Sequence, residues 1–226
     1  MIYMIHPKIQ PNLNQRSQTY RRNVHTGSPP DNIPNECLPA WTHPVSRTYL
    51  QARNVSQDES IIYDLQYCDG GRWKKRIIIP MYDDEGQLRA FQGRSVDGHP
   101  EREDKYLTEG PRPIYRPWNF GDVSLERLCV VEGPFDLFSV NRVMPTVAVL
   151  GIYPSEAQII ELQNLVQRFD QTTIWFDRGA LAQAMTLQLA LAPYKLVSVI
   201  VWDDSHDPGD CSVETVQEIL QDNKGG

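Results

Sequence analysis

The sequence predicts a mixed α/β protein in which a C-terminal domain with a mostly parallel sheet follows a smaller α+β unit. From residue 126 onward, short apolar runs alternate with helical patterns, which is typical of a parallel sheet covered by helices on both faces. Between residues 74 and 94, two apolar runs flank the turn-forming residues 83–86, and this arrangement indicates a β-hairpin. We therefore expect an irregular arm over residues 1–40, the α+β unit over 41–125 and the parallel-sheet domain over 126–226.

The N-terminal half begins with a proline-rich stretch. Residues 1–40 hold six of the 17 prolines and show no apolar period, which predicts an irregular arm. The turn signal Asp69-Gly70-Gly71 follows an apolar run and favours a strand that ends there. The elements expected before residue 126 are a helix over 39–54, a strand over 61–67, hairpin strands over 74–82 and 87–94, and a loop-rich stretch over 97–125.

The C-terminal part alternates strands with helices. Ser155 and Gln158 have the spacing of a capping box at a helix start, and apolar residues recur on one face of the helix that follows. The strands are short and apolar, as expected for strands that are buried on both faces. They are predicted over 128–132, 146–150, 172–176 and 196–202, and the helices over 135–143, 155–169, 180–192 and 213–220.

Composition narrows the classes of protein to consider. The chain has 226 residues, of which 40% are apolar and 23% charged, as in ordinary globular domains. No apolar run approaches the roughly 18 residues of a membrane span, and the N-terminus lacks a basic-then-apolar signal pattern, so we expect a cytoplasmic protein that contacts no membrane. The four cysteines form no CxxC pair, which disfavours both a zinc ribbon and a disulfide framework and predicts reduced thiols.

The net charge of −7 is unevenly distributed. Residues 1–125 hold 16 basic and 15 acidic residues, whereas residues 126–226 hold 6 basic and 14 acidic residues. An acidic surface that meets a polyanion needs a divalent cation or a basic neighbour. On charge alone, solvated surface carboxylates explain the acidic half equally well.

Three of the four strands expected in the C-terminal part end in carboxylates. Glu132 follows the first strand, Asp177 the third, and the acidic segment 203–210 the fourth. Because ligands bind beyond the carboxyl ends of parallel strands, we expect these acids to gather at one edge of the sheet. Clustered carboxylates repel one another without a cation, and oxygen ligands suit Mg²⁺ or Mn²⁺ and phosphoryl chemistry. A single acid at a strand end is more often a helix cap, so the prediction depends on all three.

The segment LCVVEGPFD, residues 128–136, carries a family likeness. It resembles the EGxxD motif that follows an apolar strand in TOPRIM domains. These are the Rossmann-like, metal-binding catalytic domains of bacterial and phage primases, topoisomerases and related nucleases. The apolar run that ends at Gly151, the run that ends at Asp177 and the segment 206–210 follow in the order of the family's later motifs.

An upstream block makes the resemblance more specific. The segment RIIIPMYDDEGQLRAFQGRS, residues 76–95, and the following DKYL, residues 104–107, are similar to the segment that precedes TOPRIM in DNA primases. Residues 43–60 also resemble the start of the polymerase core in phage primases. The FQGR and EGPxD forms are most similar to the T-even phage type. Over residues 40–220, the chain therefore resembles a phage-type DNA primase.

This resemblance implies template-directed synthesis of short RNA primers on single-stranded DNA from ribonucleotides, during phage replication in the host cytoplasm, with Mg²⁺ or Mn²⁺ and no zinc. It implies that Glu132 is a general acid or base or a metal-linked carboxylate near the 3′ end. Asp177 and Asp207 would hold the metal beside the nucleotide phosphates, with Asp136 and Asp210 as supporting acids. The residues implied to contact template and nucleotide are Arg76, Arg94, Lys105 and Tyr106.

Two departures from the family pattern bear on activity. The strand-end motif, Asp-x-Asp or Asp-x-Glu in the family, is here Asp177-Arg178-Gly179, so the second acid is absent. Cys37 is the only cysteine before the core, so the N-terminal zinc ribbon of primases is missing, and a separate zinc-ribbon module and a replicative helicase are expected partners. Two alternatives stay open. One is a TOPRIM nuclease, which the block over 76–106 disfavours, and the other is a catalytically weakened accessory that binds single-stranded DNA or a helicase.

Overall fold

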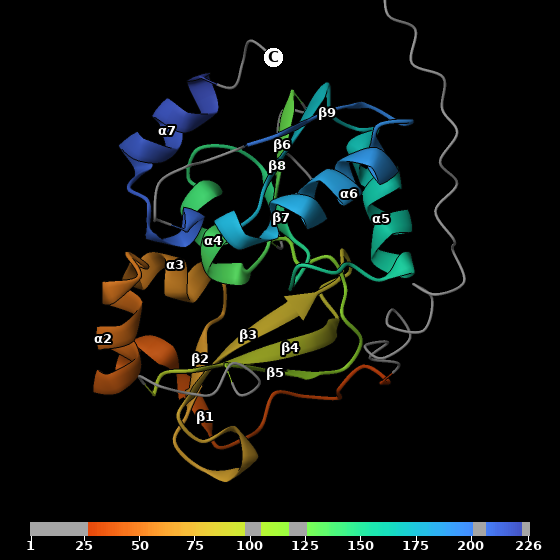
Figure 1. The fold of residues 1–226 in the computed structure, drawn as a ribbon. Helices are drawn as coiled ribbons and strands as arrows, with labels where there is room; N and C mark the ends of the chain where they lie inside the picture. Colours follow the sequence, from red (N-terminus) through yellow and green to blue (C-terminus); the bar gives the residue numbers. More distant parts are fainter. Residues whose placement is uncertain (1–26, 98–104, 118–125, 201–206, 223–226) are drawn as a thin grey trace, which may run out of the picture.

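The computed structural model describes residues 27–97, 105–117, 126–200 and 207–222, so the first part of the predicted arm lies outside the described residues. Within them, the strands form two sheets, an antiparallel sheet of five strands and a parallel sheet of four. Figure 1 shows the antiparallel sheet in the lower half of the molecule and the parallel sheet in the upper half. The mixed α/β fold predicted from the sequence is confirmed.

The antiparallel sheet contains the predicted hairpin. Strands β3 (Arg76–Tyr82) and β4 (Leu88–Ser95) pair along their length. The turn that joins them is closed by a hydrogen bond from the backbone N–H of Gln87 to the Asp83 carboxylate. Two helices, α2 (Pro44–Ala52) and α3 (Gln57–Ile62), pack beside this sheet. In spatial order, the strands are β1 (Cys37–Pro39), β2 (Gln66–Cys68), β3 (Arg76–Tyr82), β4 (Leu88–Ser95) and β5 (Tyr106–Glu109).

Two local predictions in this half are wrong. Ile61 and Ile62 end helix α3 instead of beginning a strand, because Ser56 and Glu59 form a capping box that starts a helix at Gln57. The last residues of the predicted arm, Cys37–Pro39, form strand β1, which pairs with β2. In the first place a local cap decides the element, and in the second the pairing with a distant strand outweighs the local composition.

The expectation of four reduced cysteines is also wrong. A disulfide joins Cys37 to Cys68, and these residues lie directly opposite each other on strands β1 and β2. No spacing in the sequence indicates this pair, because the two cysteines are brought together by strand pairing. Cys129 and Cys211 are buried and lie outside the disulfide.

The parallel sheet confirms the predicted alternation of strands and helices. In spatial order its strands are β7 (Thr146–Ala148), β6 (Arg127–Val131), β8 (Gln171–Trp175) and β9 (Leu196–Val199). The end of the last predicted strand, at 201–202, lies outside the described residues. The helices are α4 (Pro134–Val140), α5 (Glu156–Val166), α6 (Leu181–Leu191) and α7 (Val213–Asp222), with short 3₁₀ turns at η6 (Arg178–Ala180) and η7 (Pro208–Asp210).

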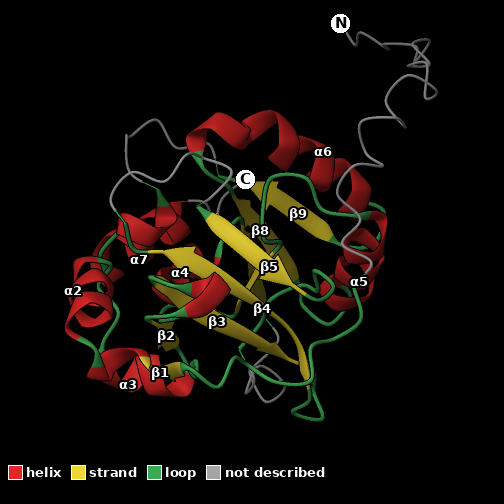
Figure 2. Cartoon of the chain, turned by 90° about the horizontal axis from the view of Figure 1, so that it is seen from below, coloured by secondary structure: helices red, strands yellow, loops and turns green. Residues whose placement is uncertain are grey.

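Helices cover both faces of the parallel sheet. Cys129 and Val131 of β6 face the side of α4 and α7, whereas Leu128 and Val130 face the side of α5 and α6. This alternation is the period of two that a strand imposes on its side chains. Figure 2 shows the helix pairs on opposite sides of the sheet. Among the described helices, none is long and apolar enough to cross a membrane.

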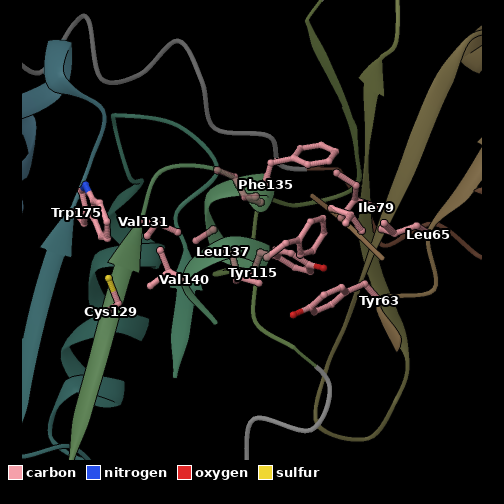
Figure 3. Packing of buried hydrophobic residues seen from close by; sticks show 14 of the residues in the cluster. Tyr63, Leu65, Ile79, Tyr115, Cys129, Val131, Phe135, Leu137, Val140 and Trp175 are labelled. Carbon is pink, nitrogen blue, oxygen red and sulfur yellow. The ribbon is translucent and has the colours of Figure 1, made fainter. Parts of the chain in front are cut away.

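One apolar core connects the two sheets. Phe135 and Phe138 of α4 pack against Tyr63 and Ile79 of the N-terminal half, and the rings of Tyr63 and Phe138 stack with centroids 4.3 Å apart. Figure 3 shows Phe135 and Tyr63 between the two sheets. Each buried aromatic side chain stabilises the fold by about 1.5–3 kcal/mol. This packing holds the start of α4 against the antiparallel sheet, and the candidate site lies at that junction.

Candidate functional site

Two of the predicted acids lie at the carboxyl edge of the parallel sheet. Glu132 directly follows β6, and Asp177 follows β8 by two residues. These strands are neighbours, with Val131 opposite Trp175 at their ends. Because parallel strands present their carboxyl ends at the same edge, the fold brings these two acids to one place, as the sequence predicts.

Asp136 stands in the first turn of α4 and binds two backbone segments. Its carboxylate accepts a hydrogen bond from the backbone N–H of Gly133, 2.8 Å away, and another from that of Gly209, 3.1 Å away. Gly133 follows Glu132, and Gly209 lies in the segment 207–211, here named the acid turn because it carries Asp207 and Asp210. One side chain therefore joins two of the acid-bearing segments.

The acids of the site repel one another. Burial, together with the charges of Asp177, Glu132 and Asp207, raises the pKa of Asp136 to about 8, although the hydrogen bond from the backbone N–H of Gly133 opposes this rise. Burial and the charge of Asp207 raise the pKa of Asp177 to about 6, although Lys105 opposes this rise. Carboxylates that share a site in this way favour a bound proton or a bound cation.

The residues present suit a hard divalent ion in their chemistry. Every candidate ligand is a carboxylate, and oxygen ligands are those that Mg²⁺ and Mn²⁺ take. The buried Oδ1 atom of Asp177 has no hydrogen-bond partner within the described part of the chain, so an acceptor there is available for a cation. The described residues assemble no group of three or more His, Cys, Asp or Glu side chains that could hold a metal. The acids predicted at 203–206 lie outside the described residues.

Asp210 forms an ion pair with an arginine. Its Oδ1 atom accepts a hydrogen bond from Nη1 of Arg53, 2.8 Å away, in an ion pair that joins the acid turn to the end of α2. Asp207, at the start of the acid turn, is exposed, as is Asp210. Exposure therefore does not distinguish the two acids, but the ion pair with Arg53 engages Asp210.

The predicted cationic residues occupy the antiparallel sheet, with different exposures. Arg94 is buried, donates from Nε to the Tyr49 hydroxyl at 2.8 Å, and has its guanidinium carbon 4.8 Å from the ring centroid of Tyr106, its partner across β4 and β5. Arg76 donates to the carbonyl oxygen of Gly93 and is half-buried. Lys105 is exposed and acts electrostatically on Asp177, so it belongs to the same site as the acids.

Sequence reasoning missed three residues of this site. They are Tyr49 on α2, Arg53 directly after α2, and Phe135 on α4. The guanidinium carbons of Arg53 and Arg94 each lie about 6 Å from the ring centroid of Tyr49, and that of Arg94 lies 6.0 Å from the ring centroid of Phe135. Tyr49 and Arg53 are four residues apart on a predicted helix and therefore share a face. That spacing was the available signal, but it did not indicate which element the face would meet.

The position of the absent second acid is sterically open. A Cβ atom built on Gly179 meets nothing within 4 Å, and the neighbouring Arg178 is exposed. The backbone there follows Asp177 into the 3₁₀ turn η6. The structure therefore places no obstacle to an acidic side chain at residue 179.

Comparison with known proteins gives one sequence relative and two solved structures of particular interest. No protein-family model matches the chain. The DNA primase of Mycoplasma genitalium is 25% identical over 165 residues, which cover 67% of this chain and 27% of that protein. The chain thus spans less than a third of the length of this curated relative.

The structural similarities cover most of the chain. The DnaG primase catalytic domain bound to ssDNA superposes with a TM-score of 0.67 at 18% identity, over 81% of this chain and 74% of that one. The primase fragment of the bacteriophage T7 primase-helicase protein superposes with a TM-score of 0.59 at 15% identity, over 92% and 84% of the two chains. The fold of this chain is thus that of the DnaG primase catalytic core.

Proposed function

We propose that this chain, which has the fold of the DnaG primase catalytic core, is the core of a phage-type DNA primase that makes short RNA primers on single-stranded DNA. The observation that supports the proposal most is that several acidic side chains and one lysine side chain lie close together at one edge of the parallel sheet. The charges of Asp177 and Asp207 act on Asp136, and the charges of Asp207 and of Lys105, which directly precedes β5, act on Asp177. Polymerisation of nucleotides needs this combination of anionic and cationic groups.

The acids have distinct roles in this proposal. Glu132 lies at the end of β6, and its carboxylate would accept the proton of the attacking 3′-hydroxyl. Asp177 and Asp207, supported by Asp136, would hold Mg²⁺ or Mn²⁺. A divalent ion bound there supplies charge neutralisation for the triphosphate and the leaving pyrophosphate.

The residues predicted to contact template and nucleotide, here named the cationic face, would position the other reactants. They are Arg76, Arg94, Lys105 and Tyr106. Lys105 is exposed beside the acids and would bind nucleotide phosphates as a point charge. Tyr106 is half-buried against Arg94, and its ring offers a surface on which an unpaired template base can stack. Arg76 and Arg94 support this face, and Arg94 does so from a buried position.

Primer synthesis by the purified chain tests the proposal. The chain is incubated with single-stranded DNA, four ribonucleotides including one that carries a label, and Mg²⁺ or Mn²⁺, and short RNA products are resolved on a denaturing gel. We expect Glu132→Gln to abolish the products and Glu126→Gln to leave them unchanged, because Glu126 is exposed ahead of β6. Primer synthesis that survives Glu132→Gln contradicts the proposal. Degradation of labelled DNA or RNA without nucleotides would favour a nuclease instead.

One observation favours a second candidate, a weakened replication accessory. The strand-end motif lacks its second acid at Gly179, so we expect this chain to bind metal more weakly than a primase with both acids. The accessory would bind single-stranded DNA through the cationic face, with a replicative helicase and a separate zinc-ribbon module as partners. Binding of labelled single-stranded DNA that depends on Lys105, together with absent primer synthesis, would support this candidate.

A further inference from the structure

Contacts from both halves of the chain fasten the acid turn to its surroundings. The backbone N–H of Gly209 donates to Asp136, and the Ser139 hydroxyl donates to the carbonyl oxygen of Cys211 at 3.1 Å. Both of these partners lie on α4, which follows Glu132 in the parallel-sheet half. The third partner is Arg53, at the end of α2, which belongs to the other half of the chain (Figure 1).

Arg53 is held in place for this contact. Its guanidinium carbon lies 6.0 Å from the centroid of the Tyr49 ring, one helical turn earlier on α2. The hydroxyl of Tyr49 in turn accepts a hydrogen bond from the buried Arg94. A side chain oriented in this way loses less conformational freedom when it binds a carboxylate. The row Arg94, Tyr49, Arg53 and Asp210 therefore runs from the cationic face to the acid turn.

A closed backbone turn links Asp210 to Asp207. The backbone N–H of Asp210 donates to the carbonyl oxygen of Asp207 at 2.9 Å, which closes the 3₁₀ turn between them. Asp207 is also near enough to Asp177 for their charges to repel. A force that fixes Asp210 thus fixes the position of Asp207 relative to Asp177.

We infer that Arg53 is a positioning residue for the acid site, which it serves by anchoring Asp210 so that Asp207 stays in place opposite Asp177. The inference assigns Asp210 to this anchor instead of to the metal, contrary to the supporting role that the family resemblance implies. It rests on the proposed function, because the acids need a defined spacing only if they hold a divalent ion together. Arg53 acts here through Asp210 and is not a catalytic residue.

Because this ion pair is partly exposed, we expect its contribution to the stability of the fold to be small. The side chains of Arg53 and Asp210 are 30% and 44% exposed, and exposed ion pairs contribute about 0–1 kcal/mol to stability. A matched control exists in the ion pair of Arg142 with Glu59, which also joins the two halves. That pair lies beyond the far end of α4 from Asp136. Loss of the control pair should lower stability without changing metal binding.

Direct titration with Mn²⁺, followed by electron paramagnetic resonance, tests the inference without relying on activity. We expect Arg53→Ala and Asp210→Ala each to weaken Mn²⁺ binding by about tenfold, as losses of supporting contacts around metal ligands do. Because both changes break the same anchor, we expect the double variant to bind Mn²⁺ as each single variant does. Glu59→Gln should lower the midpoint of thermal unfolding and leave the Mn²⁺ affinity unchanged.

Each other outcome overturns the inference. If Arg53→Ala binds Mn²⁺ like the wild type, or if Glu59→Gln weakens binding equally, Arg53 has no specific positioning role. If the two single losses multiply in the double variant, Asp210 acts independently of Arg53, as a metal ligand would. Failure of the proposed function gives a different result. In that case the wild type would bind no Mn²⁺, or would bind it no better than Asp177→Ala does, and both proposals would fall.

Discussion

The carboxylate of Asp136 accepts a hydrogen bond from the backbone N–H of Gly209 at 3.1 Å, and this bond ties the first turn of α4 to the acid turn. The same carboxylate binds the backbone N–H of Gly133 at 2.8 Å. A side chain that accepts two backbone donors is fixed in orientation, and it fixes the donors as well. Asp136 therefore organises the segments that carry Glu132 and Asp207.

Gly209 is the residue that permits this contact, so its replacement by alanine should destabilise the protein. A Cβ atom at residue 209 would lie 2.8 Å from Oδ1 of Asp136 and 3.3 Å from backbone atoms of α4. We expect Gly209→Ala to lower the free energy of unfolding by about 1–3 kcal/mol, the usual cost of overpacking. Urea unfolding measures this loss. The control is Gly179→Ala, whose Cβ meets nothing within 4 Å, and equal stability of the two variants would contradict the prediction.

Removal of the charge at Asp177 should stabilise the protein without metal. Burial and the charge of Asp207 raise the pKa of Asp177 from 3.8 to about 6. The folded state thus binds the proton more tightly than the unfolded state, and stability falls as pH rises from about 4 to about 6. We expect Asp177→Asn to raise the free energy of unfolding near pH 8 by on the order of 1 kcal/mol, because solvent screens part of this charge.

The pH dependence of this gain provides the check. Urea unfolding in the presence of a chelator should show the advantage of Asp177→Asn above about pH 6, and the advantage should vanish below about pH 4, where both forms are neutral. Mn²⁺ should stabilise the wild type and not the variant. A variant that is less stable than the wild type near pH 8 would show that the carboxylate has a favourable partner in the folded state.

The ion pair of Glu59 with Arg142 should stabilise the junction between the two halves, and the effect should depend on pH. Burial alone would raise the pKa of Glu59, but hydrogen bonds from Arg142 and Ser56 lower it below 4.5. The pair's contribution is therefore present above about pH 4.5 and is lost as pH falls through the lowered pKa. Both side chains are only 19% exposed, with Nε of Arg142 2.5 Å from Oε1.

Glu59→Gln isolates this charge, because glutamine also completes a capping box with Ser56. We expect it to lower the free energy of unfolding near pH 7 by about 1.5–3 kcal/mol, the range for hydrogen bonds to charged groups. Chemical denaturation at several pH values measures the difference. The two proteins should converge as the pH falls through the lowered pKa of Glu59, and a difference that stays constant with pH would mean that the charge contributes nothing.

The sequence was sufficient for the architecture because local signals there agree with the fold. The capping box of Ser155 and Gln158 forms as predicted at the start of α5. The acids Glu132 and Asp177 could be placed at one edge because the direction of parallel strands leaves no alternative. These predictions needed only the alternation of elements along the chain.

Contacts between distant segments could not be predicted in the same way. Arg53 and Asp210 are separated by 157 residues, and no period or motif connects them. The strand predicted at 61–67 failed because apolar residues such as Ile61 and Ile62 suit a helix end as well as a strand, and both are exposed in the structure. Short apolar runs carry this ambiguity, and here the capping box at the start of α3 resolves it in favour of a helix.

Gly179→Asp should strengthen metal binding, because it supplies the acid that the strand-end motif lacks. The position is open, since a Cβ atom there meets nothing within 4 Å, and the added carboxylate follows Asp177 by two residues. We expect a several-fold gain in Mn²⁺ affinity and, if the chain makes primers, a matching gain in primer synthesis. Gly179→Asn has the same size without the charge and serves as the control. A gain that both variants share would point to a backbone effect instead of an added ligand.

The disulfide of Cys37 with Cys68 should stabilise the N-terminal half. It joins residues with a sequence separation of 31. A crosslink of this kind restricts the unfolded chain and typically raises the free energy of unfolding by about 2–4 kcal/mol. Treatment of the wild type with dithiothreitol should therefore lower the midpoint of thermal unfolding. The double variant Cys37→Ala with Cys68→Ala should start from the lower midpoint and show no response to the reductant. A wild type that is equally stable with and without reductant would mean that β1 is held by strand pairing alone, and the crosslink would then have no role in the stability of the sheet.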